Sequence, residues 1–167
     1  MITIRKAKVG DEKAMIEFIN KQVRKKQWSY TGTNKPKNKD TIKETRENLL
    51  AKSPTTFYFL ATDEEKIIGS VGITQRGNGR LSHRATIGWG IDYNYRRRGI
   101  GTKLVKTMLI FAKKRKFKRI DAEIAIENKA SIKLAKHLGF KIECSLKKGM
   151  LLDNGKYIDT YVVGKIL

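Results

Sequence analysis

The chain is poor in cysteine, histidine and acidic residues, and it has no long apolar run. Its one cysteine, Cys144, excludes an intrachain disulfide and a metal cluster built on cysteines. Two histidines, His83 and His137, are too few for a histidine metal site. No stretch approaches the roughly 20 apolar residues of a membrane-spanning helix, and the first residues lack the apolar core of a signal peptide. We therefore expect a cytoplasmic protein that binds no metal.

The shortage of acid leaves the chain strongly basic. Sixteen Asp and Glu residues stand against 37 Lys and Arg, which gives a formal net charge of +21. Such a charge attracts anionic ligands and nucleic acid, and it repels polycationic substrates such as polyamines. The densest basic run, Lys113 to Arg119, also suits the solvated end of a helix. The sequence leaves both interpretations open: a solvated surface, or contact with RNA or the ribosome.

Length and periodicity indicate one domain over residues 1–167 with a mixed set of elements. Apolar residues at spacings of three and four predict helices from Asp11, over 41–51, from Gly99 and over 128–137. Alternating or apolar runs predict strands over 2–7, 57–62, 67–75, 85–91, 120–126 and 157–167, with a further strand entered at Phe140.

The predicted order is β-α-α-β-β-β-α-β-α-β-β, an α/β fold with a mixed sheet. Helices should cover both faces of that sheet, since neither face can be left bare. The segment 27–40 carries Trp28 and Tyr30 among lysines and turn residues, which indicates a loop. Its aromatic residues could form the floor of a substrate pocket or cap the core.

The most informative stretch is Tyr95-Arg-Arg-Arg-Gly-Ile-Gly-Thr102, which lies between a predicted strand and a predicted helix. Gly99 and Gly101 would let the backbone approach a ligand closely, because no Cβ intervenes. The first amides of the helix have no intrahelical acceptor, and with the helix dipole they favour an anion such as a diphosphate. The spacing matches neither a dinucleotide fingerprint nor a P-loop. It reads Arg96-x-x-Gly99-x-Gly101.

This pattern resembles the acetyl-CoA pyrophosphate loop, Q/R-x-x-G-x-G/A, of the GNAT superfamily of N-acetyltransferases. A second motif, from Asn128 to Phe140 (NKASIKLAKHLGF), is similar to the family's N-x-x-[AS]-x-x-L-Y-x-K-x-G-F and begins 27 residues after Gly101. The order of elements also resembles the GNAT fold over essentially the whole chain. The closest likeness is to the ribosomal-protein alanine and phosphinothricin acetyltransferase branches.

The resemblance implies acetyl-CoA as cosubstrate and a set of binding residues. Backbone amides of one loop would hold the pyrophosphate: Arg97, Arg98, Gly99, Ile100, Gly101 and Thr102. Arg96 would shape that loop. The end of the fourth strand, at Gly90 and Ile91, would separate from the fifth strand to admit pantetheine, and the Ile91 N–H would polarise the thioester carbonyl. Asn128 and Ser131 would line the cofactor.

Two positions depart from the family pattern. Ala135 stands where the family often has a tyrosine that protonates the leaving thiolate, and Thr86 stands where many relatives have a glutamate base. The remaining candidates for a base are His83, Asp92, Glu123 and Asp159, and Tyr157 and Tyr161 are candidates for an acid. Each has an ordinary alternative, such as a turn for Asp92, an exposed strand face for Glu123 and core packing for Tyr161.

The resemblance therefore predicts an N-acetyltransferase that moves acetyl directly from the thioester to a primary amine, without a covalent intermediate. A small amino compound and a protein N-terminus are both open as acceptors. The alternative is a basic acetyl-CoA-binding protein associated with RNA or the ribosome, with little or no catalysis. Relatives often form dimers, so the resemblance also leaves a homodimer open.

Overall fold

The computed structural model describes residues 1–24, 39–51, 54–152 and 154–167. The elements are β1 (Ile2–Lys6), α1 (Glu12–Arg24), α2 (Lys39–Leu50), β2 (Thr56–Asp63), β3 (Lys66–Gln75), β4 (Arg84–Ile91), α3 (Ile100–Lys114), β5 (Arg119–Ala125), α4 (Lys129–His137), β6 (Lys141–Leu151) and β7 (Tyr157–Ile166). Short 3₁₀ turns lie at Gly79–Leu81 and Tyr93–Tyr95. This order confirms the predicted one. Trp28 and Tyr30 lie outside the described residues.

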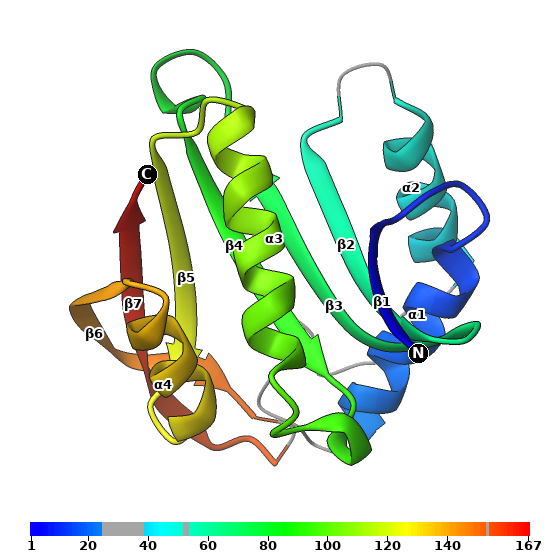
Figure 1. Ribbon diagram of the computed structural model, residues 1–167. Coiled ribbons are helices and arrows are strands. Elements are labelled where there is room, and N and C mark those ends of the chain that lie inside the picture. Colours follow the sequence, from blue (N-terminus) through cyan, green and yellow to red (C-terminus); the bar gives the residue numbers. More distant parts are fainter. Residues whose placement is uncertain (25–38, 52–53, 153) are drawn as a thin grey trace.

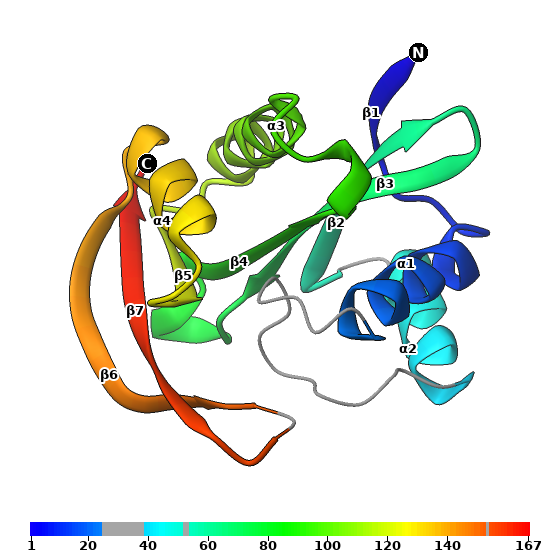
Figure 2. The ribbon, with the colours of Figure 1, turned by 90° about the horizontal axis from the view of Figure 1, so that it is seen from below.

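One seven-stranded sheet has the strand order β1-β2-β3-β4-β5-β7-β6. Neighbouring strands are antiparallel except β4 and β5, which are parallel. Helices α3 and α4 cover one face, and α1 and α2 lie on the other, over the β1–β3 side (Figure 1). Seen along the sheet, β6 and β7 curl away from the plane of the other strands (Figure 2). The expectation that helices cover both faces is confirmed.

The main core lies between α3 and the sheet. The apolar face of α3 is buried there, through Ile100, Leu104, Val105, Met108 and Ala112. Alternate residues of the central strands complete this core, among them Val71, Ile73, Ala85, Ile87, Ile120, Ala122 and Ile124. A smaller cluster under α1 includes Met15, Phe18 and Leu60. Successive residues of a strand point to opposite faces of the sheet, so one alternate set packs against α3 and the other set lies on the α1 face.

In the described part of the chain, no helix has both the length and the apolar character needed to cross a membrane.

Candidate active site

Strands β4 and β5 are paired at one end only. Their parallel ladder joins Arg84, Ala85 and Thr86 to Arg119, Ile120 and Asp121, and it stops there. Both strands continue, β4 to Ile91 and β5 to Ala125, and they diverge toward the N-terminus of α3 (Figure 1). The predicted separation of these strands is therefore confirmed. We call the space between the unpaired ends the strand gap.

A buried carboxylate marks the closed end of the strand gap. Asp121, at the last paired position, contacts Arg84 at 2.8 Å and Arg119 at 2.7 Å. Burial alone would raise the pKa of Asp121, but these two guanidinium groups outweigh burial and lower it. Arg119 also pairs with Glu143 of β6. The charged cluster ties β4, β5 and β6 together where the ladder ends.

The backbone of β4 presents alternate amides to the strand gap. The Asp92 amide donates to the Ile68 carbonyl at 2.8 Å, so Asp92 faces β3. Because an antiparallel ladder alternates, the Gly90 amide also faces β3, whereas the amides of Trp89 and Ile91 point the other way. Beyond Thr86, no strand in the described part of the chain pairs with this edge of β4 to accept them. Ile91 therefore has the predicted orientation, Gly90 contributes no amide to the gap, and Trp89 joins the site although sequence reasoning missed it.

The N-terminus of α3 opens onto the same end of the gap. Within the described residues, the amides of Gly99, Ile100, Gly101 and Thr102 have no hydrogen-bond acceptor, whereas the Lys103 amide donates to the Gly99 carbonyl. Gly99 is the residue before the helix and has φ +73°. A Cβ added to it would meet no atom within 4 Å. Four free amides at the positive end of a helix dipole are a site for an anion.

The loop that leads into α3 is held from several sides. The buried carboxylate of Asp92 accepts from Lys21 of α1 at 2.6 Å and from the Asn94 amide at 3.1 Å. The Tyr95 hydroxyl donates to Asp63 at 3.1 Å, and Arg96 donates to the Ile91 carbonyl at 3.4 Å. These contacts fix the loop, and the Arg96 contact agrees with its predicted role in shaping it.

The pKa of Asp92 reflects this anchoring. Burial by itself would raise it, but hydrogen bonds from Lys21 and from the Asn94 amide outweigh burial and hold the pKa below its usual range. A carboxylate that is buried, paired and more acidic than usual is a weak proton acceptor at neutral pH. The surroundings of Asp92 thus indicate a residue that positions the loop.

Gly101 has a different function from the predicted one. A Cβ at Gly101 would lie 3.3 Å from Leu134 of α4 and 3.6 Å from Ile91. Its missing side chain therefore lets α3 pack closely against α4 and β4, and it does not face the outside of the loop. Only the backbone amide of Gly101 remains available to a ligand.

Helix α4 borders the gap from the β5 side. The Asn128 side chain caps the helix by accepting from the Ser131 amide at 3.1 Å. Ala135, at the position of the family tyrosine, is 1% exposed and belongs to the main core. The Asn128 side-chain oxygen is thus occupied by the cap, and Ala135 offers no hydroxyl.

On the α1 face of the sheet beside the gap, none of the described residues covers Gly88. Gly88 of β4 has no atom within 4 Å of the position of a Cβ. Glu123 of β5 is exposed and lies two residues beyond Asp121, on the same face. Its carboxylate accepts from the Thr160 hydroxyl at 2.7 Å. Glu123 is thus the predicted base that the fold brings to the open part of the gap.

The other predicted acid–base residues are placed differently. His83 precedes β4 at the closed end, where its carbonyl accepts from the Lys118 amide. Asp159 pairs with Lys147 at 2.8 Å on the β6–β7 hairpin, and Lys147 lowers the pKa of Asp159. Tyr157 lies exposed at the start of β7, and Tyr161 packs against the main core, on the α3 face. His83 thus lies at the closed end. Asp159 lies beside the end of β5, where its carbonyl accepts from the Ile126 amide, but its carboxylate is paired with Lys147.

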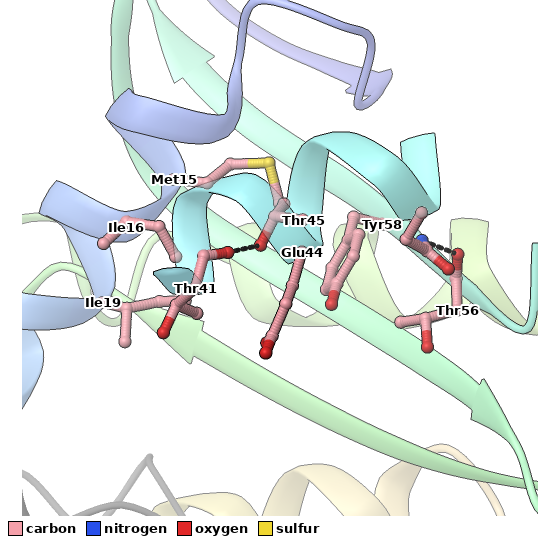
Figure 3. Close-up of a pocket in the computed structure, with 9 residues that line it drawn as sticks. Met15, Ile16, Ile19, Thr41, Glu44, Thr45, Thr56 and Tyr58 are labelled. Carbon is pink, nitrogen blue, oxygen red and sulfur yellow. Dashed lines mark hydrogen bonds between the residues drawn. The ribbon is translucent and has the colours of Figure 1, made fainter. Parts of the chain in front are cut away.

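A pocket of about 240 Å³ lies between α1, α2 and β2 (Figure 3). Its lining combines the apolar side chains of Met15, Ile16 and Ile19 with Glu44 and Tyr58, whose polar ends point the same way. Burial raises the pKa of Tyr58. None of the lining residues belongs to β4 or β5, so this pocket is separate from the strand gap. Among the described residues, no group of acidic, histidine and cysteine side chains could hold a metal ion.

Comparison with known proteins finds a family whose sequence model matches this chain. Residues 20–140, well over half of the chain, match the model of the acetyltransferase (GNAT) family. An L-amino acid N-acetyltransferase, AaaT, of Escherichia coli K12 is 29% identical over 118 residues, which are 70% of this chain and 72% of that protein.

Two solved structures share the fold. The ribosomal-protein-alanine N-acetyltransferase of Brucella melitensis superposes with a TM-score of 0.87 at 23% identity, over 99% of both chains. YncA of Salmonella typhimurium, described as a putative acetyltransferase with its cofactor acetyl-CoA, superposes with a TM-score of 0.84 at 18% identity, over 99% of this chain and 94% of that one.

Proposed function

This chain belongs to the acetyltransferase (GNAT) family, and from that premise we propose that it transfers acetyl from acetyl-CoA directly to a primary amine. Family membership and the YncA structure with acetyl-CoA support the choice of donor. The observation that carries the proposal is the meeting of two features at one place. The β4–β5 ladder ends early, and the free amides of Gly99 to Thr102 lie at the opening.

In the proposed complex the free amides of the α3 N-terminus bind the diphosphate, and pantetheine runs into the strand gap. The amides of Trp89 and Ile91 are then available to pantetheine and to the thioester oxygen. A donor aimed at the developing oxyanion strengthens its interaction in the transition state, where the negative charge forms. Asn128 and Ser131 would border pantetheine from α4.

The acceptor amine would enter from the α1 face, over Gly88. Glu123 takes a proton from its ammonium, directly or through one water, because an ammonium has no lone pair. The neutral nitrogen attacks the thioester carbonyl and becomes positively charged, and it gives its extra proton to water as the tetrahedral intermediate collapses and the C–S bond breaks. The leaving thiolate takes up a proton, for which Tyr161 is the proposed donor in the absence of a family tyrosine at Ala135. Holding amine and thioester together can supply about 7–11 kcal/mol of the barrier.

The proposed acceptor is a small amino compound or a protein N-terminus. The E. coli relative is named for L-amino acids and the Brucella neighbour for a ribosomal-protein alanine, so both classes belong in one screen. We expect thiol release from acetyl-CoA with amino acids or with N-terminal peptides, and little with spermidine, because a net charge of +21 repels a polycation. Spermidine as the best acceptor would contradict the charge argument, and no thiol release with any amine would contradict the enzyme.

A second candidate is an RNA- or ribosome-associated protein that uses acetyl-CoA little or not at all. The chain carries eleven Lys and Arg and no Asp or Glu between Asp92 and Asp121, which includes the whole of α3. Binding of this kind would weaken steeply as salt is raised. A filter-binding titration with single-stranded and hairpin RNA at 50 and 200 mM salt tests it, and binding that is absent or indifferent to salt removes it.

A further inference from the structure

Thr160 of β7 is a fully buried polar residue in direct contact with Glu123. Its exposed fraction is 0%, and its hydroxyl donates to the Glu123 carboxylate at 2.7 Å. In the β5–β7 ladder Thr160 pairs with Ala125 and Val162 pairs with Glu123, so both side chains in the hydrogen bond lie on the same face of the sheet. A buried hydroxyl that donates to an exposed carboxylate fixes the position of that carboxylate.

Gly149 of β6 supplies the space for this contact. A Cβ at Gly149 would lie 2.1 Å from the Thr160 hydroxyl oxygen and 3.2 Å from a Glu123 carboxylate oxygen. The β6–β7 ladder is irregular here, between Leu146 and Met150, and Lys148 has φ +51°. The neighbouring amide of Lys148 is held by Asp159 at 3.0 Å. The irregularity lets the β6 backbone approach the Thr160–Glu123 pair.

We propose that Thr160 is a positioning residue, which holds the Glu123 carboxylate at the strand gap through its hydroxyl, in the space that Gly149 leaves. This inference rests on the proposed function, in which Glu123 accepts the proton of the acceptor ammonium. The acetyl transfer from thioester to amine proceeds as described under the proposed function. Thr160 touches neither substrate, and its effect is exerted through Glu123.

Other charged groups surround the Thr160–Glu123 pair, and the test must leave them unchanged. Asp121 lies two residues along β5, with Arg84 and Arg119 attached to it. Lys147 and Lys148 adjoin Gly149 on β6. Lys147 is paired with Asp159, and the Lys148 ammonium lies 5.9 Å from the Tyr157 ring. The two substitutions proposed below remove or keep one hydroxyl and change none of these charges.

The test compares Thr160→Val, which removes the hydroxyl at nearly constant volume, with Thr160→Ser, which keeps it. With the acceptor found in the screen, we expect Thr160→Val to lower kcat roughly tenfold with little change in the KM for acetyl-CoA. Thr160→Ser keeps the donor and should retain most of kcat, so rescue by serine distinguishes the hydroxyl from the bulk of the side chain.

The control is Thr62→Val, at a buried threonine of β2 that is 5% exposed. It makes the same chemical change away from the gap and should leave kcat unchanged. Thermal unfolding by circular dichroism checks that each variant is folded. If Thr160→Val does not fold, Thr160→Ala, which removes the same hydroxyl without putting a methyl group in its place, is measured instead.

Glu123→Gln separates the inference from the function on which it rests. If Glu123→Gln keeps full kcat, the proposed base is wrong and the role of Thr160 falls with it. If Glu123→Gln loses activity while Thr160→Val keeps the wild-type kcat, the proposed function stands and the inference about Thr160 is wrong. A loss of kcat in Thr160→Val that Thr160→Ser does not restore would likewise overturn it by showing a purely structural role.

Discussion

At the scale of single residues, the anion-binding loop depends on contacts that join distant parts of the chain. Lys21 and Asp92 are 71 positions apart, yet they meet at 2.6 Å. The sequence placed Asp92 among the candidate bases because it follows a strand next to the loop. Nothing local to either residue indicated the ion pair, since it forms only when α1 packs on the sheet. For the same reason the Thr160–Glu123 contact was not predicted, although Glu123 itself was.

The Lys21–Asp92 pair leads to a prediction about stability and pH. The pKa of Asp92 is lowered in the folded protein, so its pair stabilises the fold above the ordinary carboxyl range near 4 and is lost as the pH falls below it. Lys21→Met should lower the free energy of unfolding at pH 7 by about 1–2 kcal/mol, because it leaves a buried carboxylate short of a donor. Near pH 3 the difference from wild type should shrink, as measured by urea unfolding at both pH values.

The matched control is Lys147→Met, which removes a pair with Asp159 at 2.8 Å on the surface, where Lys147 is 85% exposed. Exposed pairs contribute little, so this variant should unfold like the wild type. Equal losses of unfolding free energy in the two variants would show that the burial of Asp92 does not explain the contribution of the Lys21–Asp92 pair.

Gly99 allows a second prediction at this scale, because its effect on stability and its effect on acetyl-CoA binding can be measured separately. Gly99 and Gly155 have φ +73° and φ +78°, and neither would have a neighbour within 4 Å of an added Cβ. Substitution by alanine should cost each about 1–2 kcal/mol of stability through the left-handed backbone alone. Gly99→Ala should in addition raise the KM for acetyl-CoA several-fold, since its methyl group lies beside the free amides, whereas Gly155→Ala should leave the KM unchanged. Equal KM values in the two variants would contradict the placement of the diphosphate.

At the scale of elements, the pairing of strands decides where a ligand can enter. Periodicity in the sequence predicted the elements that bury one regular face to within a few residues. Strand β6 is exposed along nearly its whole length, and only its start at Phe140 was predicted. Periodicity could not predict which backbone amides stay unpaired, since that depends on the register with β3 and on where the β5 ladder stops. Register moved the gap-facing amides from Gly90 to Trp89. Alternation outward from Ile91 could have suggested Trp89.

The prediction at the scale of elements concerns Ala135 of helix α4. Ala135 stands at the position of the family tyrosine, but it is 1% exposed and packed in the core. Ala135→Tyr should therefore lower the free energy of unfolding by about 1–3 kcal/mol through overpacking, without raising kcat. The control Lys136→Tyr, on the exposed side of the same helix, should be nearly neutral. A higher kcat in Ala135→Tyr, at unchanged stability, would show that the site has room for the missing acid.

At the scale of the whole molecule, the main feature is the excess of positive charge. The formal net charge of +21 could be counted from the sequence, and so could the absence of acid between Asp92 and Asp121. This basic segment forms the anion loop and the entire helix behind it (Figure 2). The sequence already predicted the loop and the helix that carry these charges, and the fold adds that the helix packs on the sheet over the main core.

This charge predicts that the binding of acetyl-CoA depends on salt concentration. The KM for acetyl-CoA should rise several-fold between about 50 and 300 mM NaCl, because salt screens the attraction of a polyanion to a basic surface. S-acetylpantetheine, which has the same thioester and no phosphate, should bind more weakly but show a KM that is nearly independent of salt. Steady-state kinetics with both donors at fixed acceptor measure this, and parallel salt dependence would assign the effect to something other than the phosphates.

The central claim is that acetyl-CoA is held by unpaired backbone amides at the divergence of β4 and β5. The most direct measurement is amide hydrogen exchange by NMR, with and without acetyl-CoA. The account predicts new protection at Gly99, Ile100, Gly101 and Thr102, and at Trp89 and Ile91, while Gly90, which already faces β3, keeps its exchange rate. Protection that leaves these six amides unchanged, or that falls equally on Gly90, would contradict it.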